Sequence, residues 1–106
     1  MAIRGIKRAI ISGATSGDNT LVTAVTGKKI RVLSLFLVAA GAVTVRFESG
    51  AGGTALTGVM SVAANGSLVL PFNEAGWFET AAAALLNMEL GGAVQISGAL
   101  VYQEVS

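Results

Sequence analysis

The sequence predicts an all-β, single-domain, jelly-roll-like β-sandwich of about eight antiparallel strands. Three observations favour this class: short segments rich in β-branched and aromatic residues, glycine-rich turn signals every 8–15 residues, and no apolar pattern with a helical period. The 106 residues are enough for one domain and not for two. We therefore expect a single domain over 1–106, in which residues 1–5 can form a flexible N-terminal arm.

The longest apolar stretch, "KKIRVLSLFLVAAGAVTVRF", covers residues 28–47. Fourteen uncharged residues separate Arg31 from Arg46, whereas a membrane-spanning helix needs about 20 predominantly apolar residues. Because β-branched and aromatic residues favour strands, no membrane segment is expected here. We predict two strands folded back on each other around Gly41, with apolar and polar residues alternating over 43–48.

The first of these strands is apolar on both of its predicted faces. Val32, Phe36 and Val38 fall on one face, and Leu33, Leu35 and Leu37 fall on the other. Such a strand needs cover on both sides, and a second subunit can supply part of that cover. The composition agrees, since 12% of the residues are charged against about 25% in typical soluble domains. We expect a closed homo-oligomer, a trimer, with a tightly packed monomer as the alternative.

Turn signals place the other elements. The strands are expected at 6–11, 20–26, 29–38, 43–49, 55–62, 67–71, 77–80, 85–90 and 94–104. Asn65-Gly66 predicts a hairpin, because a type I′ turn requires φ > 0 at both central residues, and "LGGA" at 90–93 predicts another. Residues 80–84 are expected to form a loop, with a helical turn as the alternative. The predicted core includes Val32, Leu35, Val43, Val45, Phe47, Leu70, Phe72 and Ile96.

Charge is divided between the two halves of the sequence. All seven basic residues lie in 1–47, and residues 48–106 hold five acids and no base. One interpretation is a solvated surface, and the other is complementary faces that meet between subunits or on a larger partner. The candidate contact residues are Arg4, Lys7, Arg8, Arg31 and Arg46. The net charge of +1 argues against a dedicated nucleic-acid-binding protein.

The residue types exclude most enzyme chemistry. Without cysteine or histidine, the chain cannot form a Ser-His-Asp or Cys-His arrangement, a disulfide or a thiolate metal site. The loop "SGAGGT" lacks the Lys-Ser/Thr of a phosphate-binding loop. We expect no enzyme activity, no catalytic residue, no metal and no cofactor. The N-terminus lacks an apolar signal segment, so synthesis in a cytoplasm is expected.

The only tryptophan lies in "GWFET", residues 76–80. An exposed Trp77-Phe78 pair could stack on a sugar ring, as in a carbohydrate-binding module. In the other interpretation, one ring fills the core and the other covers it.

Five segments together carry a family resemblance. They read "SGDNTLV", "GKKIRVLSLFLVAAGAVTVRFESG", "LTGVMSVAANGSLVLPF", "GWFETAAAALLNMEL" and "VQISGALVYQEV". Over about residues 10–105 this pattern resembles the small β-sandwich head decoration (cement) proteins of tailed bacteriophages. The resemblance implies a jelly-roll-like domain, often a trimer, that binds the major capsid protein on the outer surface of the head and stabilises it. It supplies no active-site residues.

Related folds also serve in phage tails and fibres. A tail or fibre module, with sugar binding through Trp77, is therefore the alternative function. In both cases the expected location is the virion, after synthesis in the host cytoplasm.

Overall fold

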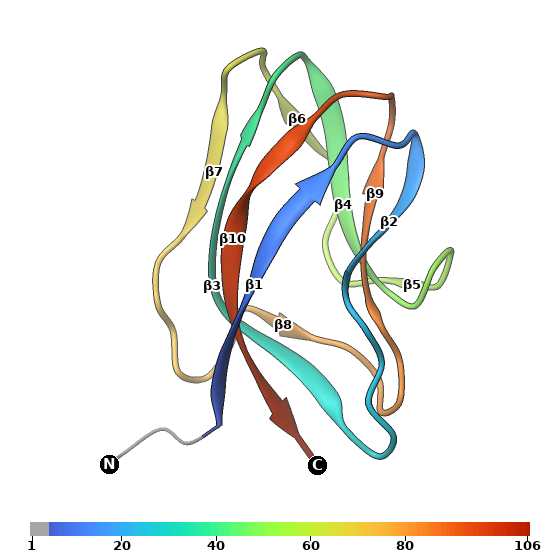
Figure 1. Ribbon diagram of the computed structural model, residues 1–106, viewed down its shortest axis with the longest axis vertical. Helices are drawn as coiled ribbons and strands as arrows, with labels where there is room; N and C mark the ends of the chain where they lie inside the picture. The colour runs from blue at the N-terminus through green and yellow to red at the C-terminus, as the bar shows by residue number, and fades with distance from the viewer. Residues whose placement is uncertain (1–4) are drawn as a thin grey trace.

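The computed structural model describes residues 5–106, and every regular element in that range is a β-strand. The strands form two antiparallel sheets that pack face to face (Figure 1), which confirms the predicted single-domain β-sandwich. The strands are β1 (Ile6–Gly13), β2 (Gly17–Val22), β3 (Lys29–Ala39), β4 (Val43–Ser49), β5 (Thr54–Ala55), β6 (Met60–Val62), β7 (Ser67–Leu70), β8 (Phe78–Glu79), β9 (Leu86–Leu90) and β10 (Ile96–Val105). Within residues 5–106 there is no helix of the length and apolarity that crossing a bilayer requires.

Strands from the two ends of the chain pair with each other in both sheets. One sheet, here called sheet A, has the order β1-β10-β3-β7, and β8 also pairs with β3. The other, sheet B, has the order β2-β9-β4-β5, and β6 also pairs with β4. Most connections therefore cross from one sheet to the other, so that strands adjacent in sequence face each other across the core.

This topology contradicts all three predicted hairpins. The turn at Gly41 leads from β3 in sheet A to β4 in sheet B, and the turn at 90–93 leads from β9 back to β10. At Asn65-Gly66 the chain crosses from β6 to β7, and only Asn65 has a positive φ, 61°. The sequence could not distinguish a hairpin within one sheet from a turn that crosses between the sheets. Both use the same turn residues, and both join half-apolar strands.

A β-bulge in β3 changes which side chains point inward. The register with β10 shifts between Val101 and Tyr102, and Val32 and Leu33 opposite this shift are both buried. Beyond it Leu35 and Leu37 are buried, whereas Phe36 and Val38 are exposed. The predicted grouping of Val32 with Phe36 and Val38 is therefore wrong, because an extra residue reverses the alternation. The strand does, as predicted, carry large apolar residues on both faces.

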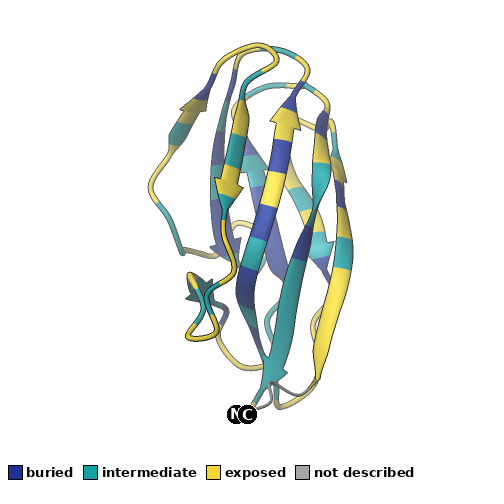
Figure 2. Ribbon diagram, turned by 90° about the vertical axis from the view of Figure 1, so that its left-hand side faces the viewer, coloured by how far each residue is buried: buried dark blue, intermediate teal, exposed yellow. Residues whose placement is uncertain are grey.

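The core lies between the two sheets, and burial alternates along the strands (Figure 2). Phe47 is fully buried and stacks on Phe78 from sheet A, with the ring centroids 5.2 Å apart. Six of the eight predicted core residues are buried, namely Val32, Leu35, Val43, Val45, Phe47 and Ile96. Leu70 is only partly buried. Phe72 is 55% exposed, because it lies beyond the end of β7 and past Pro71, where the strand alternation no longer applies.

Two of the predicted strands differ clearly from those in the structure. The strand expected at 20–26 is β2, which begins at Gly17 because the polar residues before Thr20 already pair with β9. The strand expected at 55–62 is two short pieces, β5 and β6, both paired with β4. Residues 80–85 form a loop, as expected, in which Ala83 has a φ of 61°.

Candidate functional site

The predicted contact residues do not form one patch. Arg4 lies outside the described residues. Lys7 and Arg8 are both in β1, the strand that the sequence predicted at 6–11. Lys7 pairs with Glu104 of the neighbouring strand β10, with 3.1 Å between Nζ and Oε1.

The other two predicted residues find acidic partners in the same chain. Arg31 of β3 lies opposite Glu79 of β8, and its Nε donates to Oε1 at 2.9 Å. Arg46 of β4 lies opposite Glu89 of β9, and its Nη2 donates to Oε1 at 2.9 Å. The basic half and the acidic half of the sequence thus meet within one subunit, because their strands pair. A role for Arg31 and Arg46 between subunits stays a prediction.

Arg46 belongs to a polar network on the outer face of sheet B. Its guanidinium also bonds the buried Glu48, with Nε 3.0 Å from Oε2. That hydrogen bond is the main cause that raises the pKa of Arg46. Asn87, which is fully buried, donates from Nδ2 to Asp18 at 2.8 Å and to Glu48 at 2.9 Å. Among residues 5–106 the Asn87 Oδ1 has no hydrogen-bond partner.

Three carboxylates of this network lie close enough to hold a cation. One oxygen each from Asp18, Glu48 and Glu89 lies within 4.8 Å of the others. However, Arg46 already bonds Glu48 and Glu89, and the Asn87 amide bonds Asp18 and Glu48. Donors therefore already bond both oxygens of Glu48 and one oxygen each of Asp18 and Glu89, so the three carboxylates belong to an ion-pair and hydrogen-bond network.

The outer face of sheet A has the opposite character. Ile10 of β1 lies opposite Ala99 of β10, Ala99 opposite Phe36 of β3, and Phe36 opposite Val69 of β7. This row crosses all four strands, and its three large members are 79%, 55% and 63% exposed for Ile10, Phe36 and Val69. We call this surface the apolar face; its exposed large residues are Ile10, Phe36, Val38, Val69 and Phe72.

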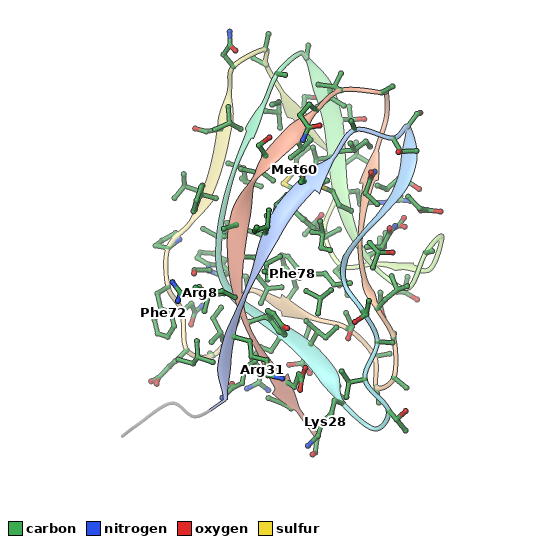
Figure 3. The ribbon with its side chains drawn as sticks, viewed as in Figure 1. Arg8, Lys28, Arg31, Met60, Phe72 and Phe78 are labelled. Atoms are coloured by element: carbon green, nitrogen blue, oxygen red, sulfur yellow. The ribbon has the colours of Figure 1, made fainter. Side chains whose placement is uncertain are left out.

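A shallow hollow of about 420 Å³ opens on the apolar face. Small residues, including Ser34 and Ala99, line it together with the larger Phe36, Phe72 and Arg8. Arg8 and Phe72, which come from opposite edges of sheet A and both line this hollow, lie near each other in the view of Figure 3. The hollow is mainly apolar with one cation at its rim, so its chemistry suits an apolar surface that also presents a carboxylate.

Trp77 directly precedes β8 and lies beside the segment that follows β7. Its side chain is 44% exposed, and its indole Nε1 donates to the Pro71 carbonyl at 2.8 Å. With Phe47 and Met60 it lines a hollow of about 160 Å³, while Phe78 packs on the core. This geometry agrees with the interpretation in which one ring fills the core and the other covers it.

The apolar face was not among the residues singled out from the sequence, although part of its signal was present. The two-sided apolar character of 29–38 pointed to it. The continuation of the apolar face onto β1 and β7 depends on the register between distant strands, which the sequence does not show.

Comparison with known protein families, curated proteins and solved structures found no match.

Proposed function

We propose that this chain is a non-enzymatic structural protein of a virion: a head decoration protein that binds the outer surface of the major capsid protein as a homotrimer. The observation that carries the proposal is the exposed apolar face of a small sandwich, whose described residues, 5–106, form strands and no helix. A face of this kind suits a protein whose work is surface contact. The bacteriophage resemblance in the sequence supplies the kind of partner.

The size of the face supports contact with protein. Its five large side chains expose roughly 500 Å² of apolar surface, near the upper end of the largest patch on a typical monomer, about 300–600 Å². Patches of this size commonly mark protein interaction sites. The charged side chains, by contrast, are mostly paired within the chain.

Linked contacts account for how such a protein stabilises a head. A closed oligomer seated on a capsid can hold several capsid subunits at once. Each contact can be weak, because the second and later contacts form at high effective concentration, and the gain in avidity is about 10²–10⁴. Head binding should therefore depend on the oligomer more than on any one side chain.

The test uses phage heads that lack the protein. Purified protein is added, the heads are sedimented, and their stability to heat is compared with and without it. We expect saturable co-sedimentation and a higher temperature of DNA release. Heads that already carry their full complement are the control and should gain nothing. Failure to bind heads, or recovery of the protein only in purified tails, would replace this proposal with the tail or fibre module.

A further inference from the structure

We infer that the apolar face is the surface on which a second copy of this chain packs, and that Arg8 of one copy pairs with Glu74 of the next. This inference deepens the proposed function and rests on its homo-oligomer. It identifies the surface, the partner and one intersubunit contact. Three independent observations carry it: unpaired charge, exposed area and the shape of the face.

The first observation is the pairing of charge within the chain. Twelve charged side chains lie in residues 5–106, and ten of them have a hydrogen bond or an ion pair there. The two that have neither within that range are one cation, Arg8, and one anion, Glu74. Arg8 and Glu74 are therefore a cation and an anion that have no partner among the described residues, and a second copy carries both.

The second step is the placement of these two residues. Arg8 lies in β1, which forms one edge of sheet A, and Glu74 follows β7, which forms the other edge. β1 and β7 are three strand spacings apart, about 14 Å, with the apolar face between them. Two copies packed through this face can bring Arg8 of one near Glu74 of the other. A two-fold contact makes this pairing reciprocal, and a closed ring repeats it around the axis.

The area of the face fits a second copy. A stable interface buries about 800 Å² per partner, and the five large side chains of the face supply a substantial part of that area. The Arg31–Glu79 and Lys29–Glu79 ion pairs do not interrupt the apolar face, because they lie at one end of the sheet. The row that holds Ile10, Phe36 and Val69 contains no charged side chain, and Arg8 lies two residues before Ile10, opposite Val101.

The shape of the face offers both halves of an interlocking contact. Ile10 and Phe36 protrude from one row, and the hollow next to that row is lined by small residues such as Ser34. Packed sheets lie about 10 Å apart and interdigitate their side chains. A protruding ring of one copy can therefore enter the hollow of the other, where the Arg8 guanidinium lies at the rim.

The test is sedimentation velocity, with native mass spectrometry, over a range of concentrations. The wild-type chain should sediment as an oligomer at micromolar concentration. Phe36→Glu should raise the dissociation constant more than about 100-fold, because it leaves a carboxylate unpaired in the interface. The matched control is Val59→Glu, which places the same carboxylate at an exposed apolar position outside sheet A and should associate as the wild type does.

A charge exchange tests the pairing. Arg8→Glu and Glu74→Arg should each weaken association about tenfold at low salt, because like charges then face each other. The double variant carries the exchanged pair and should recover most of the wild-type affinity. Lys28→Glu, whose lysine bonds Ser106 in its own chain, controls for the change in net charge. Circular dichroism confirms that each variant keeps its strand signal.

The outcomes separate this inference from the head-binding proposal. A wild-type chain that stays monomeric overturns self-association, while the assay with heads still tests the capsid partner. An oligomer that persists in Phe36→Glu overturns the choice of face. A double variant that associates no better than the single variants overturns the Arg8–Glu74 contact.

Discussion

Phe47→Ala should remove an aromatic contact between the two sheets. Phe47 is fully buried in sheet B and stacks on Phe78 of sheet A. Truncation of a buried phenylalanine costs about 3–5 kcal/mol of unfolding free energy, from the lost transfer term and the cavity left behind. The hollow of about 160 Å³ beside this ring is also lined by Leu56 and Met60. These side chains can move into the space, so we expect the lower part of the range, about 3–4 kcal/mol.

The assay is urea unfolding followed by far-UV circular dichroism. For a domain of this size, 1 kcal/mol corresponds to about 4–8 °C, so the thermal midpoint should fall by at least about 12 °C. Phe72→Ala is the matched control: the same truncation at a side chain that is 55% exposed should cost less than about 1 kcal/mol. Both variants are measured at several protein concentrations, so that association does not enter the comparison.

A double-mutant cycle then isolates the contact between the two rings. Phe47→Ala and Phe78→Ala together should show a coupling of about 0.5–1.5 kcal/mol, as found for aromatic pairs. A cost below about 1 kcal/mol for Phe47→Ala, or a coupling near zero, would refute the reasoning. In either case the sheets would not be held together through this pair.

Three further predictions concern backbone approach, charge and the tryptophan. Gly98→Ala should cost about 3 kcal/mol of unfolding free energy, because a Cβ there would lie 1.9 Å from the carbonyl oxygen of the neighbouring strand; Gly92→Ala, where nothing lies within 4 Å, should be nearly neutral in the same urea titration. Arg46→Glu should lower the thermal midpoint of the subunit itself, and most at low salt, since its partners lie in the same chain; a midpoint unchanged at low salt would contradict the network. Sugars should not quench the fluorescence of Trp77, because its ring lines the hollow beside Phe47 and Met60 and covers the core there; saturable quenching would favour the sugar-binding alternative.

The sequence predicted the fold class because alternation and turn residues are local signals. The alternation of Val43, Val45 and Phe47 with polar residues was visible directly, and all three side chains are buried. What the sequence could not show was which strands pair. A turn such as Asn65-Gly66 looks the same whether the next strand lies beside the previous one or across the core from it.

The contact residues were harder to predict for the same reason. Arg46 and Glu89 are far apart in sequence, and only the pairing of β4 with β9 places them opposite each other. The charge split suggested complementary faces between subunits or on a larger partner, and that interpretation stays a prediction. Without the strand pairing it could not show that Arg46 and Glu89 bond each other within one subunit. The side chain of Val32 points inward because of a β-bulge, and no residue type in that strand predicts the bulge.

The two outer faces of the sandwich differ in the chemical groups that they present to a partner. On sheet B, Arg46 and Asn87 already bond the carboxylates of the network, although three carboxylates against one guanidinium leave a net negative charge there. On sheet A, large apolar side chains face outward without cover in the single chain. Apolar burial depends weakly on salt, whereas exposed charge pairs are screened beyond about 10 Å at 0.1 M. Association through sheet A should therefore take its strength from apolar area and its register from the single Arg8–Glu74 pair, which is the division expected of a permanent structural contact.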